Sequence, residues 1–96
     1  MKDYIKIIKI SSVAMSQDGQ YLVVGGEKGT VFIYRSHDLS LAYTYPQCDA
    51  SIRSLAVTQD QKYIIAGLST GCLIVFNVNF NLITYRRKTE ASNRNQ

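Results

Sequence analysis

The sequence predicts an all-β chain built from two copies of one four-stranded unit, with no helix. One observation is a repeat: residues 13–34, VAMSQDGQYLVVGGEKGTVFIY, return at 55–76 as LAVTQDQKYIIAGLSTGCLIVF, without a gap. The other is composition, because Val, Ile, Tyr, Thr and Phe form short runs that Gly, Asp, Asn and Ser interrupt, as in strands separated by turns. A repeat of this length with several short strands is typical of β-propeller blades.

The first unit is expected to form strands near 12–16, 21–25, 30–34 and 41–45. Two of its turns contain a glycine, Gly19 and Gly29, and glycine adopts a positive φ angle at little cost. Pro46 should end the last strand, because proline has no N–H for a continuing ladder.

The second unit repeats this order, with strands expected near 52–58, 63–67, 72–77 and 82–85. The middle strands of both units are continuous apolar runs, which predicts strands buried on both faces. Four segments result. They are an N-terminal edge strand at 1–10 (either bare or from a preceding blade), the first blade at 11–46, the second at 47–87, and a disordered polar tail at 88–96.

Charge and cysteine content exclude several classes of protein. The net charge is +4, but four of the eleven basic residues lie in the last eleven positions, so a basic nucleic-acid-binding face is not indicated. Cys48 and Cys72 have neither paired spacing nor a nearby histidine, which favours free thiols in a reducing compartment. The start, MKDYIKIIKI, lacks the continuous apolar core of a signal peptide.

Both units resemble WD repeats. The resemblance rests on Ser16-Gln17-Asp18-Gly19 with Gly29–Tyr34, and on Thr58-Gln59-Asp60 with Gly71–Asn77. The Trp-Asp pair of the family falls on Tyr34-Arg35 and Phe76-Asn77, and its Gly-His pair falls on Gln47-Cys48 in the second unit. The family's buried polar network therefore cannot form, and apolar packing must hold the blades together.

Two segments narrow the resemblance. YPQCDASIRSL at 45–55 and IVFNVNFN at 74–81 are similar to the last WD repeats of the BEACH-domain family of neurobeachin and the LPS-responsive beige-like anchor protein. This resemblance implies a non-catalytic protein-interaction module of a cytoplasmic membrane-trafficking scaffold, at most peripherally associated with membranes. It implies protein partners and no cofactor. The BEACH and PH-like domains of that family are not contained in these residues, so their activities are not transferred.

No catalytic, cofactor or metal site is expected. His37 lies in a Ser-His-Asp turn, and three adjacent loop residues cannot form a catalytic triad. Asp18 and Asp60 occupy equivalent turns, where each can accept backbone N–H bonds. The glycines at 25–29 are followed by a strand, so they indicate a hairpin rather than a phosphate-binding loop.

Binding is expected at loops, as in most folds. The 47–51 loop and the two turns at 27–28 and 69–70 should emerge at the same end of the sheets. The candidate partner-contact residues are Glu27, Lys28, Asp49, Ser51, Arg53, Ser69 and Thr70. Seven tyrosines could instead form a base-stacking platform, but Tyr21 and Tyr63 recur at the repeat period, which favours packing between blades.

Two blades do not close a propeller, and both ends would expose strand edges and apolar faces. We therefore expect the chain to be completed either by further blades of a longer propeller or by other copies of itself. Three copies would give six blades and four would give eight. Two alternative functions stay open, namely an oligomeric propeller that binds a small ligand such as a sugar between blades, and a nucleic-acid-binding module.

Overall fold

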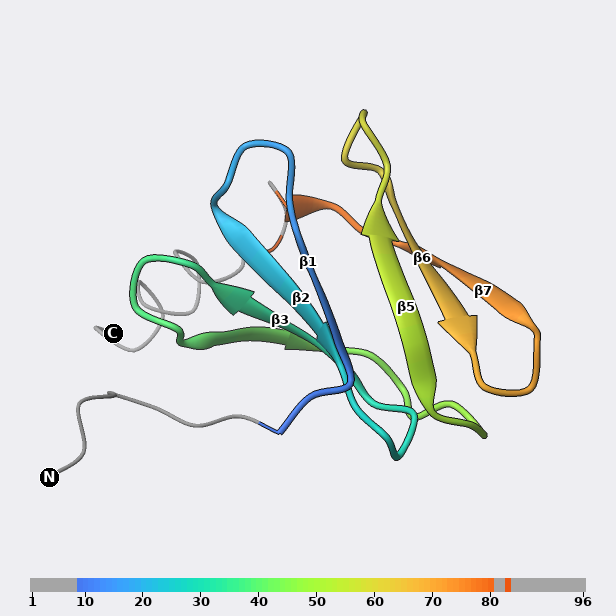
Figure 1. Ribbon diagram of the computed structural model, residues 1–96. Coiled ribbons are helices and arrows are strands. Elements are labelled where there is room, and N and C mark those ends of the chain that lie inside the picture. The colour runs from blue at the N-terminus through green and yellow to red at the C-terminus, as the bar shows by residue number, and fades with distance from the viewer. Residues whose placement is uncertain (1–8, 81–82, 84–96) are drawn as a thin grey trace, which may run out of the picture.

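The chain forms two antiparallel sheets in the computed structural model, which describes residues 9–80 and residue 83 (Figure 1). Sheet 1 has the order β1-β2-β3-β4 and sheet 2 the order β5-β6-β7, so each strand pairs with its neighbours in sequence. The strands are β1 (Ser12–Met15), β2 (Tyr21–Gly25), β3 (Val31–Arg35), β4 (Leu41–Thr44), β5 (Ile52–Val57), β6 (Tyr63–Leu68) and β7 (Leu73–Asn77).

The all-β prediction is confirmed, and these seven strands each begin and end within one residue of the expected ranges. Two expected segments fall mainly on residues that the structure does not describe. These are the edge strand at 1–10, of which only Lys9 and Ile10 are described and neither is in a strand, and the tail at 88–96.

The structure differs from the prediction at Ile83, the only described residue of the strand expected at 82–85. Its N–H donates to the carbonyl of Asn79 at 3.0 Å, which is the i to i−4 bond of a helical turn. The reason lies just before it, where Val78 and Phe80 are buried. The Phe80 ring stacks on Tyr21 of sheet 1, with the ring centroids 4.8 Å apart. The chain therefore turns inward after β7 instead of continuing beside it.

The two turns between the first pair of strands in each sheet share one backbone shape. Gly19 has a φ of +75°, as the sequence predicts, and its repeat equivalent Gln61 has a φ of +59°. A residue with a side chain is strained in this conformation. The Gln61 side chain offsets the strain through a contact between the sheets, because its Oε1 accepts the Asp18 N–H at 2.9 Å.

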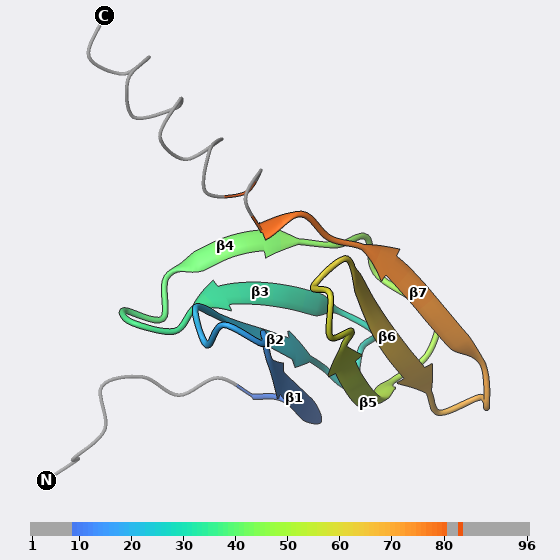
Figure 2. The ribbon, with the colours of Figure 1, turned by 90° about the horizontal axis from the view of Figure 1, so that it is seen from above.

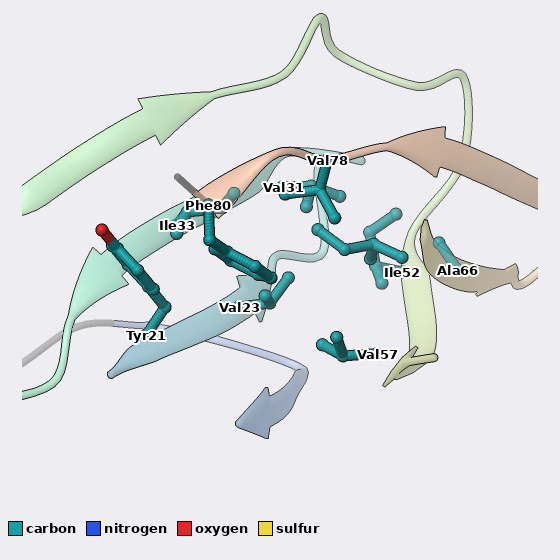
Figure 3. Close-up of a cluster of buried hydrophobic side chains, with 10 residues drawn as sticks. Tyr21, Val23, Val31, Ile33, Ile52, Val57, Ala66, Val78 and Phe80 are labelled. Atoms are coloured by element: carbon teal, nitrogen blue, oxygen red, sulfur yellow. The ribbon is translucent and has the colours of Figure 1, made fainter. Parts of the chain in front are cut away.

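The core lies between the sheets, which pack face to face with β1 beside β5 (Figure 2). Strand pairing places alternate residues of each strand on one face. Sheet 1 contributes Tyr21, Val23, Val31 and Ile33, which we call its closed face. Sheet 2 contributes its own closed face, Ile52, Val57, Ile64 and Ala66, with Val78 and Phe80 inserted from the segment after β7 (Figure 3).

Apolar packing thus forms the interior of the junction between the two blades, as expected from the missing polar network of the WD family, and hydrogen bonds such as that of Gln61 lie at its edge. Ser16 is the one buried polar residue in the described part of the chain. Each large side chain that is fully buried contributes about 1.5–3 kcal/mol. This arrangement holds the loops at both ends of the sheets in fixed positions.

Candidate functional site

Three loops meet at one end of the sheets, at the bottom of Figure 1. They are the β2–β3 turn at 26–30, the β4–β5 loop at 45–51 and the β6–β7 turn at 69–72, and we call them together the loop end. The sequence predicted that they emerge at the same end, and the hydrogen bonds between them confirm this placement. Their role in binding a partner stays a prediction.

Hydrogen bonds tie the β4–β5 loop to the β2–β3 turn. The Gln47 side-chain amide donates to the Lys28 carbonyl at 2.6 Å, and the Ser51 hydroxyl donates to the Glu27 carbonyl at 2.7 Å. The third loop joins them through the Ser69 N–H, which donates to the Ser51 carbonyl at 3.0 Å. The loop end is therefore one hydrogen-bonded surface made from both sheets.

Gly29 allows this close approach. Its φ of +84° belongs to the left-handed region that favours glycine. A β-carbon there would overlap the Cys48 carbonyl oxygen and lie 2.8 Å from that of Ala50. The Cys48 N–H donates to the Gly29 carbonyl at 2.8 Å. The glycine predicted as a turn residue thus also provides the surface against which the β4–β5 loop packs.

The predicted contact residues are mostly accessible at this end. Six of the seven are exposed, namely Glu27, Lys28, Asp49, Arg53, Ser69 and Thr70. Ser51 is half-buried, and its hydroxyl is engaged by Glu27. Arg53 lies at an irregularity in the pairing of β5 with β6. Among the described residues, His37 and Asp38 form the only ion pair, so the loop-end charges have no described counter-ion.

A recess of about 650 Å³ opens beside the β2–β3 turn. It is lined by Lys9, Ile10, Gly26, Glu27, Lys28 and Thr30. The sequence reasoning missed Lys9 and Ile10 because it assigned them to a separate edge strand. The repeat itself carried the missing signal, since Ile10 stands at the same repeat position as the buried Ile52.

The opposite end has a structural role. The Asp18 carboxylate accepts hydrogen bonds from the Ser16 hydroxyl at 2.7 Å and the Gln20 N–H at 3.0 Å. Asp60 repeats this with the Thr58 hydroxyl at 2.7 Å and the N–H two residues later at 3.1 Å. The hydroxyl bond is the main reason why the pKa of each carboxyl lies below its ordinary value. The interpretation of both aspartates as turn residues is confirmed.

The remaining candidate groups are dispersed. His37 is exposed in the β3–β4 turn, 3.5 Å from Asp38. Both cysteines are free, and burial raises the pKa of the Cys48 thiol. Tyr21 is buried between the sheets as predicted, whereas its equivalent Tyr63 is exposed on sheet 2.

Tyr45 bridges the sheets from the end of β4. Its hydroxyl donates to the Asn77 carbonyl at 2.8 Å, and its ring lies 4.6 Å from that of Phe76, centroid to centroid. Burial raises its pKa to about 12. Tyr45 therefore acts as an apolar and hydrogen-bonding link, and the Tyr43 ring packs edge-on against it with the centroids 4.9 Å apart.

Neither a metal-binding cluster nor a membrane-spanning helix is found among the described residues. No group of three or more His, Cys, Asp and Glu residues there could hold a metal ion. No helix in that part of the chain is long and apolar enough to cross a bilayer.

Comparison with known sequences identifies relatives. A family model described as "WD domain, G-beta repeat" matches residues 5–35. Proteins named "Putative neurobeachin homolog" from Caenorhabditis briggsae and Caenorhabditis elegans are each 36% identical to the chain over 80 residues. Each match covers 83% of this chain and 3% of the relative. The chain thus spans a small fraction of the length of the curated relatives that it matches.

Solved structures show the same fold. The crystal structure of the RRP9 WD40 repeats matches with a TM-score of 0.66 at 10% identity, covering 77% of this chain and 24% of that one. That of the computationally designed Ika4 protein matches with a TM-score of 0.62 at 17% identity, covering 73% and 41%. At these identities the likeness concerns the fold alone, and it confirms the prediction of WD-type propeller sheets.

Proposed function

Because the chain belongs to the WD-repeat family and is related to the neurobeachin homologues, we propose that it is a non-catalytic module that binds protein partners through its loop end. The two sheets supply a rigid frame, and the loops present the recognition groups. Binding residues on loops that a rigid scaffold positions are common in such folds.

One observation carries this proposal. The loop end combines three loops that are hydrogen-bonded to each other with exposed charges that have no described counter-ion. A preorganised surface loses little conformational entropy on binding. Glu27, Lys28 and Asp49 present both signs of charge within this surface, and Arg53 follows it at the start of β5. A partner with a mixed-charge polar surface therefore fits it best.

The wider role we propose is that of a trafficking scaffold. The supporting observation is the relationship to the neurobeachin homologues, of which the chain spans 3%. The module would then act in the cytoplasm, with peripheral attachment to intracellular membranes through the scaffold's partners.

A capture experiment with the full chain tests the binding surface. The immobilised protein is compared with a loop-end variant, Lys28→Glu with Arg53→Glu, and with a control variant at the opposite end, Lys62→Glu, all three being exposed residues. Proteins retained from a cytosolic extract are identified by mass spectrometry. We expect one set of proteins to be retained by the wild type and the control and lost from the loop-end variant.

Other outcomes would contradict the proposal. Equal retention by all three proteins would place binding elsewhere on the chain. Retention of RNA at about 0.2 M salt, where contacts from a few exposed charges weaken steeply, would favour the nucleic-acid alternative. The trafficking role is tested separately by fractionating cells with an antibody to this chain. Recovery in the nuclear fraction alone would contradict it.

A further inference from the structure

The outward surface of sheet 2 repeats the closed face of sheet 1. Tyr63, Leu73 and Val75 stand at the repeat positions of Tyr21, Val31 and Ile33, and strand pairing places them together on the side of sheet 2 that faces away from sheet 1. Val31 and Ile33 are fully buried, whereas Leu73 is 71% and Val75 58% exposed. We call this surface, with Ile65, the open face of sheet 2.

The outward surface of sheet 1 in turn repeats the closed face of sheet 2. The residues on this side are Val13, Met15, Leu22, Val24, Phe32 and Tyr34, and we call them the open face of sheet 1. Val24, on the middle strand β2, is 4% exposed. Met15 corresponds to the buried Val57 but is 54% exposed, and Ile10 corresponds to the fully buried Ile52 but is 42% exposed. The described residues therefore carry both halves of the internal junction a second time, and neither of the two described sheets covers them.

Each of the two repeat-equivalent surfaces contains a glycine at the same position. In the internal junction a β-carbon on Gly25 would lie 2.5 Å from Cγ2 of Ile52, so that junction requires a glycine. Gly67 is the repeat equivalent of Gly25. The atoms nearest to a β-carbon built on Gly67 belong to Ser54 and Leu73 of its own sheet, and none comes from sheet 1. The open face of sheet 2 thus has a residue without a β-carbon where Gly25 receives Ile52 in the internal junction, and the Ser54 side chain lies beside it.

Hydrogen bonds at the turns support the match between the two open faces in part. They also indicate that a contact between these faces would be weaker than the internal junction. In the internal junction the Gln17 side chain donates to the Val57 carbonyl at 3.3 Å, and the Asp18 N–H donates to Gln61 Oε1. The equivalent residues Gln59 and Asp60 are exposed. On the open face of sheet 1, however, Gly19 replaces Gln61 and offers no side-chain acceptor.

We infer that the open face of sheet 2 binds the open face of sheet 1 of a second copy of this chain, head to tail, with Ile10 of that copy above Gly67. The reason is that the internal junction already joins the closed faces of the two sheets, and the two open faces are their repeat equivalents. Because the two faces differ, the contact is heterologous and repeats until a ring closes. This inference concerns the apolar faces and is independent of the loop end.

Light scattering on the full chain, over a range of concentrations up to roughly 100 µM, tests the inference. We expect the mass to rise from the 10.8 kDa of one chain to a defined multiple of it. Val75→Asp on one face or Met15→Asp on the other should raise the concentration for half-association about tenfold or more, because each buries an unpaired charge. His37→Asp, an exposed turn substitution on neither face, should leave it unchanged.

Mixing the two variants gives the sharpest result. A Val75→Asp chain keeps its sheet 1 face and a Met15→Asp chain keeps its sheet 2 face, so the mixture can form one intact junction. We expect a complex of one chain of each kind and nothing larger.

Gly67→Ala should also prevent association without adding charge, while circular dichroism confirms that its strands are retained. A wild-type chain that stays monomeric, or association that Gly67→Ala leaves unchanged, would overturn the inference.

Discussion

Ile52 lies directly against Gly25, with its Cγ2 atom 2.5 Å from the point where a β-carbon would stand. The first residue of β5 thereby contacts the last residue of β2, 27 positions earlier in the chain. Both are fully or nearly fully buried, so this contact sets how closely the two sheets approach.

Gly25→Ala should destabilise the chain by about 1–3 kcal/mol, the usual cost of overpacking a core. Ile52 cannot move away, because it is fully buried between the sheets. Urea denaturation of the purified chain, followed by circular dichroism, measures the effect.

Gly67→Ala is the matched control for stability. Its β-carbon meets the Ser54 hydroxyl, the end of a side chain that can rotate, and alanine is favoured over glycine in a strand by roughly 0.5–1 kcal/mol. At protein concentrations too low for association, which would itself add to the stability of the wild type, we expect little change or a small gain in unfolding free energy. Equal losses for the two variants would mean that the junction does not depend on the Gly25 contact.

Gly29→Ala and Gly71→Ala separate backbone strain from steric overlap. Both residues have a φ near +90°, so both variants should lose roughly 1–2 kcal/mol to left-handed strain. The β4–β5 loop packs against Gly29, whereas nothing lies within 4 Å of a β-carbon built on Gly71. The Gly29→Ala loss should be clearly the larger in urea denaturation, and similar losses would show that the loop can shift freely.

Ser16→Ala should cost about 1–2 kcal/mol. The buried Ser16 hydroxyl accepts the Tyr21 N–H at 3.1 Å and donates to Asp18, so the variant weakens a hydrogen bond to a buried strand. Thr58→Ala removes the equivalent contacts to Tyr63 and Asp60 at an exposed turn, and water can replace them there. The free energy of unfolding should therefore fall less, and a larger fall for Thr58→Ala would contradict this assignment.

Stability should decline below about pH 4 through the turn aspartates. The hydrogen bonds from Ser16 and Thr58 hold the pKa values of Asp18 and Asp60 below the ordinary 3.8. A carboxyl whose pKa is lowered in the folded state stabilises it above the unfolded pKa, and the contribution is lost as the pH falls through the folded pKa. Urea midpoints at pH 7, 5, 4 and 3 should show this decline, and Asp18→Asn should make it shallower. Identical pH profiles for the two proteins would contradict it.

Much of the local structure follows from short stretches of sequence. Gly19 and Gly29 predicted two turns because only glycine takes a positive φ freely, and the apolar runs predicted the middle strands. The loop end was also foreseeable, since antiparallel strands return alternate loops to the same end. Its hydrogen bonds were not, because they join residues 18 to 24 positions apart through groups common to many loops. Lys9 and Ile10 were missed because they precede the most similar part of the repeat.

What the sequence determined by itself is the repeat, the strands and the turns, because these depend on backbone preferences and on side-chain alternation within a few residues. Only the tertiary structure decided which copy of each repeated residue is buried. Tyr21 and Tyr63 have the same local surroundings, yet one stacks on Phe80 and the other faces outward. Burial depends on which surface lies opposite, and a second sheet covers only one side of the first. The same reason explains why Phe80 draws the chain inward after β7 and places a helical turn at Ile83, where a strand was expected.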